Sequence, residues 1–488
     1  MSKLVDQYGR PLRSVGNTSR SMRASYDAAA TTDDNRRHWA AADGLSAVLA
    51  NSAYVRKRLR ERSRYEVANN SYARGILNTL AAYTVGSGPT LQLTYRGEDD
   101  SIDADAMRKA TKQVEGLWAN WAYTRRLAQK LSTLQLAVDT DGEAFAITTS
   151  SRRVSMHTPV QLDLRLYECD HFDDTSGTDE AGVRIGSDGE AVEYAFTKEH
   201  PGDSLSFAPS KWIGADQVMH LFRVERPGQL RGIPKTTPAL PLFALLRRFT
   251  LATIRAAETA ADFAAILYGD HAPEDQPADQ RAAAWDRIEI EMGAMLSVPA
   301  GSRLAQFKAE HPNATYDEFV RAILREIARC LGMPAVLALG DASKYNYSSG
   351  RLDLQAFHRQ VEVDRANLIE RVLLDRLLEL WLDEALLIDG FLPPLFAQHA
   401  ANFEWGWRWA APGHVDRKKE ADGQAVELSQ HTTTLAREYA RQGLDWETEL
   451  RQRARELSVM RELGITTEQA APSQPAEEPE EEEEEAEV

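Results

Sequence analysis

Residues 315–334, TYDEFVRAILREIARCLGMP, determine how the rest of the chain is interpreted. Thr315 and Glu318 form a capping box, in which the threonine hydroxyl accepts from an amide three residues on and the glutamate reaches back. Gly332 followed by Pro334 supplies a left-handed cap and a stop. The sequence therefore predicts a short helix bounded at both ends. Its apolar face recurs at three- and four-residue spacing and consists of Phe319, Ile323, Leu324, Ile327 and Leu331.

A polar loop and a second, much longer helix follow. Arg351 to Asp389 contains neither Gly nor Pro, and at about 1.5 Å per residue this stretch would make a rod of roughly 58 Å. Between the helices, residues 340–350 read GDASKYNYSSG, which is too polar for a core yet carries two tyrosines and a lysine. Loops placed between rigid elements often carry function. We therefore predict that this loop is a functional element.

The residues around the loop resemble the lambda-like family of tailed-phage portal proteins. The similarity is carried by Gly332-Met333-Pro334, by Asn346-Tyr347-Ser348-Ser349 and by Arg351, and it extends from about Arg36 to Leu463. In that family the preceding helix resembles the second stem helix, the loop the channel loop and the following helix the wing helix of a ring-shaped DNA conduit. The residues that the resemblance places at the DNA channel are Lys344, Tyr345, Asn346, Tyr347, Ser348 and Arg351.

The resemblance implies an α+β, predominantly helical, portal-type fold with an α/β wing, a two-helix stem, a small clip, a long wing helix and a helical crown. The implied segments are a flexible N-terminal arm (1–35), the first part of the wing with helices and a strand-rich section (36–234), the first stem helix (235–270), the clip (271–313), the second stem helix (314–333), the channel loop (334–350), the long wing helix (351–390), the C-terminal wing or crown (391–468) and a disordered acidic tail (469–488).

It also implies a function. Portal proteins form a ring, usually dodecameric, at one capsid vertex of the virion. The ring nucleates head assembly, docks the large terminase subunit at the clip, contacts the major capsid protein and a head-completion or adaptor protein, and conducts double-stranded DNA during packaging and ejection. We accordingly expect no catalysed reaction, no cofactor and no metal, and assembly in the host bacterial cytoplasm.

Composition agrees with a large structural subunit. The chain has 488 residues, of which 43% are apolar and 27% charged, enough to bury a sizeable core in more than one part. Charged residues interrupt the most apolar stretch, Ala239 to Leu267, so no membrane span is expected. Cys169 and Cys330 are too few for a disulfide framework, and Cys330 is predicted to be a buried free thiol.

Charge is unevenly distributed along the chain. The net charge is −17, yet residues 1–75 hold 14 Lys/Arg against 7 Asp/Glu, whereas the stretch from Glu477 to Val488 carries nine glutamates and no base. Most of this surface would repel DNA. That balance suits a channel through which a duplex slides without sticking.

Several local patterns suggest a binding site for a ligand. The run Arg56 to Arg64 could bind nucleic acid, although a solvated helix face or a subunit contact is favoured because Glu61 and an apolar seam accompany it. Asp139 to Glu143 suggests calcium, but Asp-Gly alone predicts a hairpin turn between strands. Glu168-Cys169-Asp170-His171 suggests a metal. Because neighbouring strand residues face opposite sides, we expect none there.

Three other patterns are given structural interpretations. Val85-Gly86-Ser87-Gly88-Pro89 lacks the third glycine and the following helix of a dinucleotide loop. His220 is interpreted as a strand-end residue. The aromatic stretch Phe403 to Trp409 could stack bases, but a core edge or a subunit contact is favoured because Arg408 is its only base. Gln129 to Val224 is predicted to consist of strands and turns, and Leu240 to Tyr268 to form a long helix.

Two rivals to a portal remain. A nuclease or ATPase of the packaging machinery would need a phosphate loop or a clustered carboxylate site, and the sequence displays neither. A non-ring structural scaffold would explain the long helix, but it would not explain the strand-rich section or the polar loop.

Overall fold

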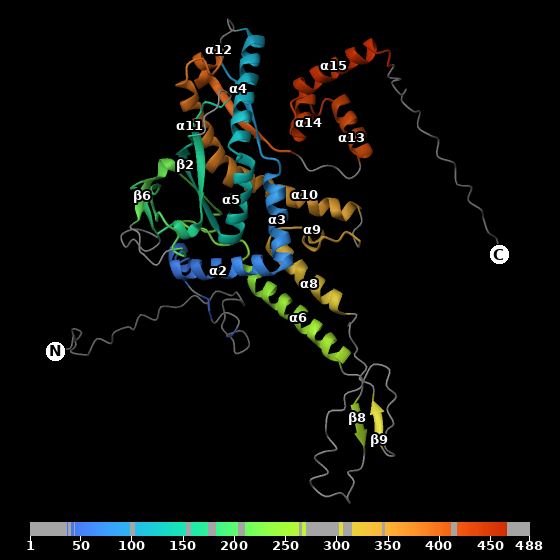
Figure 1. Cartoon of the computed structure of the whole chain (residues 1–488). Coiled ribbons are helices and arrows are strands. Elements are labelled where there is room, and N and C mark those ends of the chain that lie inside the picture. The colour runs from blue at the N-terminus through green and yellow to red at the C-terminus, as the bar shows by residue number, and fades with distance from the viewer. Residues whose placement is uncertain are drawn as a thin grey trace, which may run out of the picture.

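The computed structural model describes residues 37, 41–42, 44–97, 103–152, 158–173, 182–203, 210–262, 266–269, 302–305, 315–343, 347–410 and 417–465. Helices predominate, and the strands form small antiparallel sheets, so the predicted α+β, predominantly helical class is confirmed. Figure 1 shows a mixed body with a pair of helices projecting from it toward a small two-stranded ladder. None of the described helices has the length and hydropathy needed to cross a membrane.

The body begins with a short helix α1 (Ala47–Ala50) and two longer helices, α2 (Ala53–Asn69) and α3 (Ser71–Val85). Asn70 separates the two, and its side chain accepts from the amides of Tyr72 and Ala73, which caps α3. Strand β1 (Thr90–Tyr95) and helices α4 (Ala104–Thr124) and α5 (Leu127–Asp141) follow. Gln129 to Asp141 is therefore helical, and the prediction of strands for that part is wrong.

The predicted hairpin turn at Asp141-Gly142 is wrong as well. Gly142 has φ 96° and caps the end of α5, after which strand β2 (Glu143–Ser150) begins. A left-handed glycine ends a helix as readily as it makes a hairpin turn, so the dipeptide alone does not distinguish the two. A side chain here would also collide with the backbone, because a Cβ would lie 2.6 Å from the carbonyl carbon of Ile233.

The strand-rich section consists of two three-stranded antiparallel sheets. In the first, β2 is central between β3 (Leu162–Tyr167) and β7 (Val218–Phe222). In the second, β5 (Ala191–Phe196) lies between β4 (Val183–Ile185) and β6 (Lys211–Gly214). The 3₁₀ turns η2 (Cys169–His171) and η4 (Ala215–Gln217) connect them. The strands predicted in this part of the chain are thus confirmed.

The 3₁₀ turn η5 (Thr237–Ala239) leads into α6 (Leu240–Asp262), and α8 (Thr315–Cys330) returns beside it. Strands β8 (Ile266–Gly269) and β9 (Ser302–Ala305) pair antiparallel at the far end. The predicted bounds of α8 are confirmed, with Gly332 at φ 68° after its end. The helix predicted to reach Tyr268 instead ends at Asp262, and its last residues form β8.

The predicted long rod is helical but not straight. After α9 (Ala335–Leu339) come α10 (Tyr347–Asp364), a ten-residue π-helix η6 (Arg365–Leu374) and α11 (Asp375–Leu386). Figure 1 shows α10 and α11 pointing in different directions, as π segments inside helices commonly cause. Arg365 opens η6 and donates to the carbonyls of Tyr83 and Thr84, which satisfies the end of α3.

The chain continues through α12 (Pro394–Gln398), η7 (Ala400–Asn402) and β10 (Phe403–Arg408), which pairs antiparallel with β1. Phe403 is buried, and the indoles of Trp405 and Trp407 donate to Asp375, so the aromatic stretch lies at a core edge as favoured. The chain then forms α13 (Arg417–Ser429), α14 (Leu435–Arg441) and α15 (Trp446–Glu462).

Three apolar clusters hold the body together. The first, built on Trp118, Trp121 and Trp381, joins α4, α5, η6 and α11 to the sheet of β2. The second joins α3, α6, α8 and α10. The third fills the space between the two sheets around Phe145. The helical run from α10 to α11 therefore crosses from the second cluster into the first.

Candidate functional site

Most of the predicted channel residues fall outside the described part. Lys344, Tyr345 and Asn346 lie between the described ranges, while Tyr347 and Ser348 open α10 with only their backbone described. Arg351 is exposed on the first turns of α10. The assignment of these six residues to a DNA channel stays a prediction.

The projecting helices α6 and α8 pack through aromatic contacts. The ring of Phe249 lies 5.5 Å from that of Tyr316 and 4.5 Å from that of Phe319, measured between centroids. Nearer the body, Ile327 and Leu331 are fully buried in the second cluster with α3 and α6 of the same chain. These two residues of the predicted apolar face therefore fix α8 to its own subunit.

Other apolar side chains of this helical hairpin are half-exposed, and they lie on more than one side of it. Leu245, Leu251 and Ile254 on α6 are each 50% exposed, and Phe319 on α8 is 48% exposed. Nothing in the described part of the chain covers their outer sides. Single exposed leucines are normal, whereas several on one projecting hairpin indicate a contact surface.

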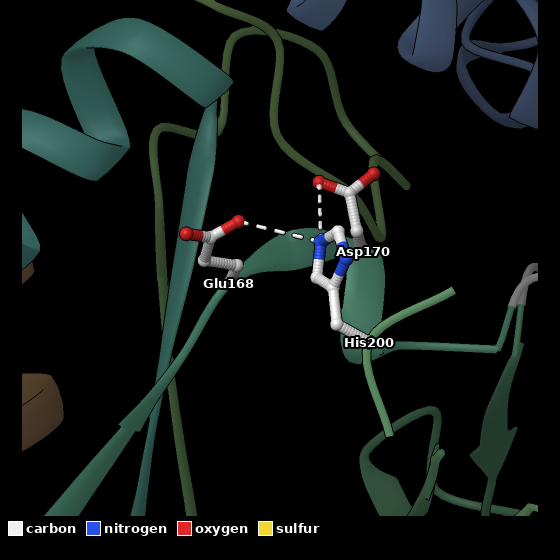
Figure 2. A group of neighbouring side chains, drawn as sticks. All are labelled: Glu168, Asp170 and His200. Atoms are coloured by element: carbon white, nitrogen blue, oxygen red, sulfur yellow. Dashed lines mark ion pairs between the residues drawn. The ribbon is translucent and has the colours of Figure 1, made fainter. Parts of the chain in front are cut away.

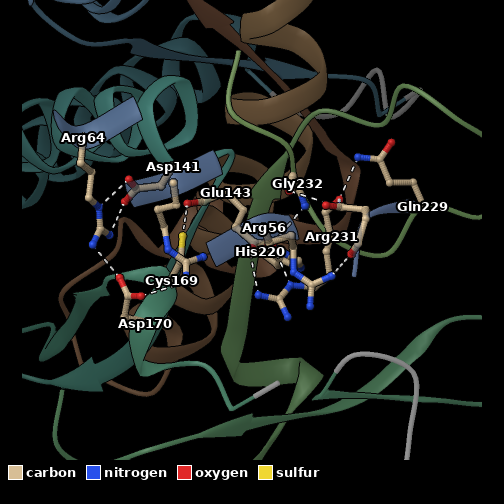
Figure 3. A network of polar contacts seen from close by, with 12 residues as sticks. Arg56, Arg64, Asp141, Glu143, Cys169, Asp170, His220, Gln229, Arg231 and Gly232 are labelled. Carbon is tan, nitrogen blue, oxygen red and sulfur yellow. Dashed lines mark hydrogen bonds and ion pairs between the residues drawn. The ribbon is translucent and has the colours of Figure 1, made fainter. Parts of the chain in front are cut away.

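A buried ion pair fixes the segment that leads into α6. The Arg231 guanidinium donates to both oxygens of the Glu143 carboxylate, from Nε at 2.8 Å and from Nη2 at 2.6 Å. The Gly232 amide donates to the same carboxylate at 3.1 Å, and His220 Nε2 lies 3.0 Å from it (Figure 3). Burial alone would raise the pKa of Glu143, but Arg231 and His220 lower it well below its usual range.

His220 is therefore not a strand-end residue. It lies in the middle of β7, is 8% exposed and stacks on Phe145 with ring centroids 4.3 Å apart. Burial lowers the pKa of His220 despite the neighbouring carboxylate of Glu143, so the ring is neutral at pH 7 and donates from Nε2. Sequence reasoning missed the Glu143–Arg231–His220 group because its members come from segments far apart in the chain.

The same segment is tied to other elements. The Gln229 side-chain amide donates to the carbonyls of Arg223 and Arg231, and the Asn51 side chain donates to the carbonyl of Arg231 at 3.0 Å. The hydroxyls of Ser63 and Thr236 lie 2.7 Å apart. Residues 229–236 are thus hydrogen-bonded to α2, to β2 and to Arg223 just after β7, and this holds the start of α6 against the body.

The basic run of α2 is divided between two faces. Arg60 pairs with Asp170 at 2.8 Å, and Arg64 binds both oxygens of Asp141 at 2.7 and 2.6 Å. With Arg56, which donates to the carbonyl of Asn51, these arginines recur every four residues and face the body. The remaining bases, Lys57, Arg58 and Arg62, are exposed. Half of the bases in the run therefore make contacts within the chain and the other half form an exposed face, and the spacing of four was the signal that could have shown this division.

One trio of side chains has metal-ligand chemistry. His200 Nε2 lies 3.5 Å from Glu168 Oε2 and 3.8 Å from Asp170 Oδ2 (Figure 2). His200 comes from the turn after β5, about thirty residues beyond the carboxylates, so sequence spacing could not reveal it.

The trio does not fit a cation. Arg64 Nη1 already lies 2.7 Å from Asp170 Oδ2, so a metal there would face a fixed positive charge. His200 Nδ1 accepts from the Gly202 amide at 3.0 Å, which puts the ring proton on Nε2. The nitrogen that points at the carboxylates is therefore a donor. Both cysteines are free; Cys169 is buried, whereas Cys330 is only half-buried and not buried as predicted.

Residues 34–365 match the family model described as phage portal protein, lambda family. The match spans more than half of the chain, which defines the class as a phage portal protein. The chain belongs to the lambda family of these proteins.

Two solved structures match this chain at low sequence identity. A chain from the neck of a native gene transfer agent particle is 14% identical, with a TM-score of 0.40 over 78% of this chain and 92% of that chain. A HK97-family phage portal protein from Corynebacterium diphtheriae is 13% identical, with a TM-score of 0.29 over 59% of this chain and 82% of that chain.

Proposed function

We propose that this chain assembles into a closed ring at one capsid vertex and conducts double-stranded DNA during packaging and ejection. The observation that carries the proposal is the projecting hairpin of α6 and α8, whose outer apolar side chains are half-exposed on a chain of the portal family. Burying apolar surface away from water lowers the free energy by about 25 cal/mol per Å². A second copy of the hairpin supplies that cover.

The charges of the hairpin favour contact between unlike faces. Described α6 exposes Arg248 and Arg255 against one acid, Glu258, and is net basic on its surface. Described α8 exposes three acids, Asp317, Glu318 and Glu326, against two bases, Arg325 and Arg329. Packing α6 of one copy on α8 of the next brings opposite charges together. Such head-to-tail contacts close into a ring when the rotation between copies divides a full turn.

The remaining roles rest on membership of the family. The ring nucleates head assembly and contacts the major capsid protein and a head-completion protein, and the clip (271–313) docks the large terminase subunit. Lys344, Tyr345, Asn346, Tyr347, Ser348 and Arg351 line the channel and contact phosphates without reading bases. The ring works by geometry and catalyses no reaction.

The test is ring formation by purified protein without nucleotide or metal, measured by negative-stain microscopy and native mass. Leu251→Asp places a charge in the proposed contact and should leave folded monomers. Leu387→Asp is the matched control, because Leu387 is 84% exposed and lies away from the hairpin, and it should leave rings intact. Wild-type protein that stays monomeric at micromolar concentration, or forms only open filaments, would contradict the ring. If Leu251→Asp forms normal rings, the hairpin is not the contact between copies.

A further inference from the structure

The C-terminal helical unit, residues 417–465 with α13, α14 and α15, lacks a core. In the described part of the chain no apolar side chain of this unit is fully buried, and none of the three apolar clusters includes one of its residues. Leu444 and Leu450 are 40% and 38% exposed, and Val459 is 46% exposed. Figure 1 shows the three helices grouped to one side of α4. The unit is therefore not held to the body by an apolar core.

Ion pairs hold it instead. Lys112 Nζ on α4 lies 2.6 Å from Asp445 Oδ2, and Arg108 Nη1, one turn earlier, lies 2.9 Å from Glu447 Oε1. Arg408, at the end of β10, donates to the carbonyl of Leu444 at 3.2 Å. These contacts meet at the first turn of α15. We call the pairs Arg108–Glu447 and Lys112–Asp445 the ionic latch.

Asp445 pairs with Lys112 of α4 and also caps the start of α15. Its carboxylate accepts from the amide and the hydroxyl of Thr448, at 2.9 and 2.8 Å, and so caps α15. Burial alone would raise the pKa of Asp445, but Lys112 and Thr448 lower it to about 2. The carboxylate therefore stays charged at ordinary pH, and the latch does not depend on titration near neutrality.

We propose that the C-terminal helical unit is a separate body that the ionic latch docks on α4, and that it leaves α4 when salt screens these charges. Partly exposed ion pairs are individually weak, and added salt weakens them further because the Debye length falls from about 8 Å at physiological ionic strength to about 3 Å at 1 M. The unit carries nine basic and nine acidic residues, so no net charge attracts it to the acidic remainder. Its docking rests on the local pairs.

The experiment measures a distance between two labels in the full-length chain. With Cys330→Ser as background, cysteines at Lys109 on α4 and Arg455 on α15, both exposed, carry the labels. Labelled chains are diluted into unlabelled ones, so the reading is the same whether or not rings form. In low salt we expect one narrow distribution of short distances. In 1 M salt it should become broader and longer.

Charge reversal separates the latch from a general effect of salt. Arg108→Glu should broaden the distribution already in low salt, and Arg108→Glu with Glu447→Arg should restore the narrow one. The matched control is Arg96→Glu, which reverses a charge paired with Glu404, outside the latch, and should change nothing. A distribution that stays narrow in 1 M salt and in Arg108→Glu would overturn the proposal. So would a broad distribution in wild type at low salt.

Discussion

Arg231 and Glu143 form a two-pronged ion pair in which the two side chains are only 2% and 1% exposed. The pair joins the segment before α6 to the first residue of β2. Because a charge buried without its partner is far costlier than the pair itself, this contact specifies one position of the helical hairpin against the body.

Removing one charge of the pair should destabilise the subunit strongly. Glu143→Gln removes the negative charge that accepts from Nε and Nη2 of the buried Arg231 guanidinium, and we expect a loss of about 3–5 kcal/mol in the free energy of unfolding by urea. Replacing both residues by methionine should cost less than the single change. A loss below about 1 kcal/mol for Glu143→Gln would show that the pair is solvated in solution.

His220 should make stability depend on pH near neutrality. Its pKa is lowered in the folded chain, so on acidification the unfolded chain takes up a proton near its ordinary pKa of about 6.5 before the folded chain does. The stabilisation is complete above that pH and is lost as pH falls toward the folded value. The free energy of unfolding should fall between pH 7 and pH 5, and His220→Gln should reduce this slope. An unchanged slope would show that other histidines dominate.

Two residues of α8 should separate folding from assembly. Ile327 is fully buried in its own subunit, so Ile327→Asp should cost several kcal/mol and reduce soluble, folded protein. Phe319 is 48% exposed, although its ring also contacts Phe249 of α6, so Phe319→Asp should lower the melting temperature by less than Ile327→Asp and should weaken rings. Circular-dichroism melting beside native mass measures both effects. If Phe319→Asp unfolds the chain, the outer face of the hairpin belongs to the subunit core.

The channel loop should affect DNA and not assembly. Replacing Lys344 by alanine and Tyr345 and Tyr347 by serine removes one charge and two aromatic surfaces from a polar loop, where surface changes usually alter stability by less than about 0.5 kcal/mol. Rings should form normally, while nuclease-protected packaged DNA should fall because the duplex loses non-specific contacts. Loss of rings would make the loop an assembly element. If the loop variant packages DNA as well as wild type does, the loop does not contact DNA during packaging.

The acidic tail should be dispensable for assembly. Deleting residues 469–488 removes a stretch dominated by glutamate, proline and alanine, a composition that cannot bury enough apolar surface to form a core. The truncated protein should form the same rings by native mass. Failure to assemble would show that the tail contacts the ring.

Local signals predicted part of this fold and tertiary contacts decided the rest. The C-terminal end of α8 follows from Gly332, whose φ is 68°, so the sequence sufficed there. Asp141-Gly142 ends a helix or turns a hairpin equally well, and only the helix α5 that precedes it shows which. Arg60 and Arg64 looked like surface charges because their partner Asp170 lies far along the chain.

The π-helix η6 has a consequence for how the two halves of the long helix are related. In an uninterrupted α-helix each residue is rotated by about 100° from the one before it. The direction of one side chain therefore fixes the direction of every later one. The wider turns of η6 take up extra residues between Asp364 and Asp375. Phe357 faces the second cluster and Trp381 faces the first. The π-helix gives α10 and α11 a relative rotation that an uninterrupted α-helix of the same length would not have.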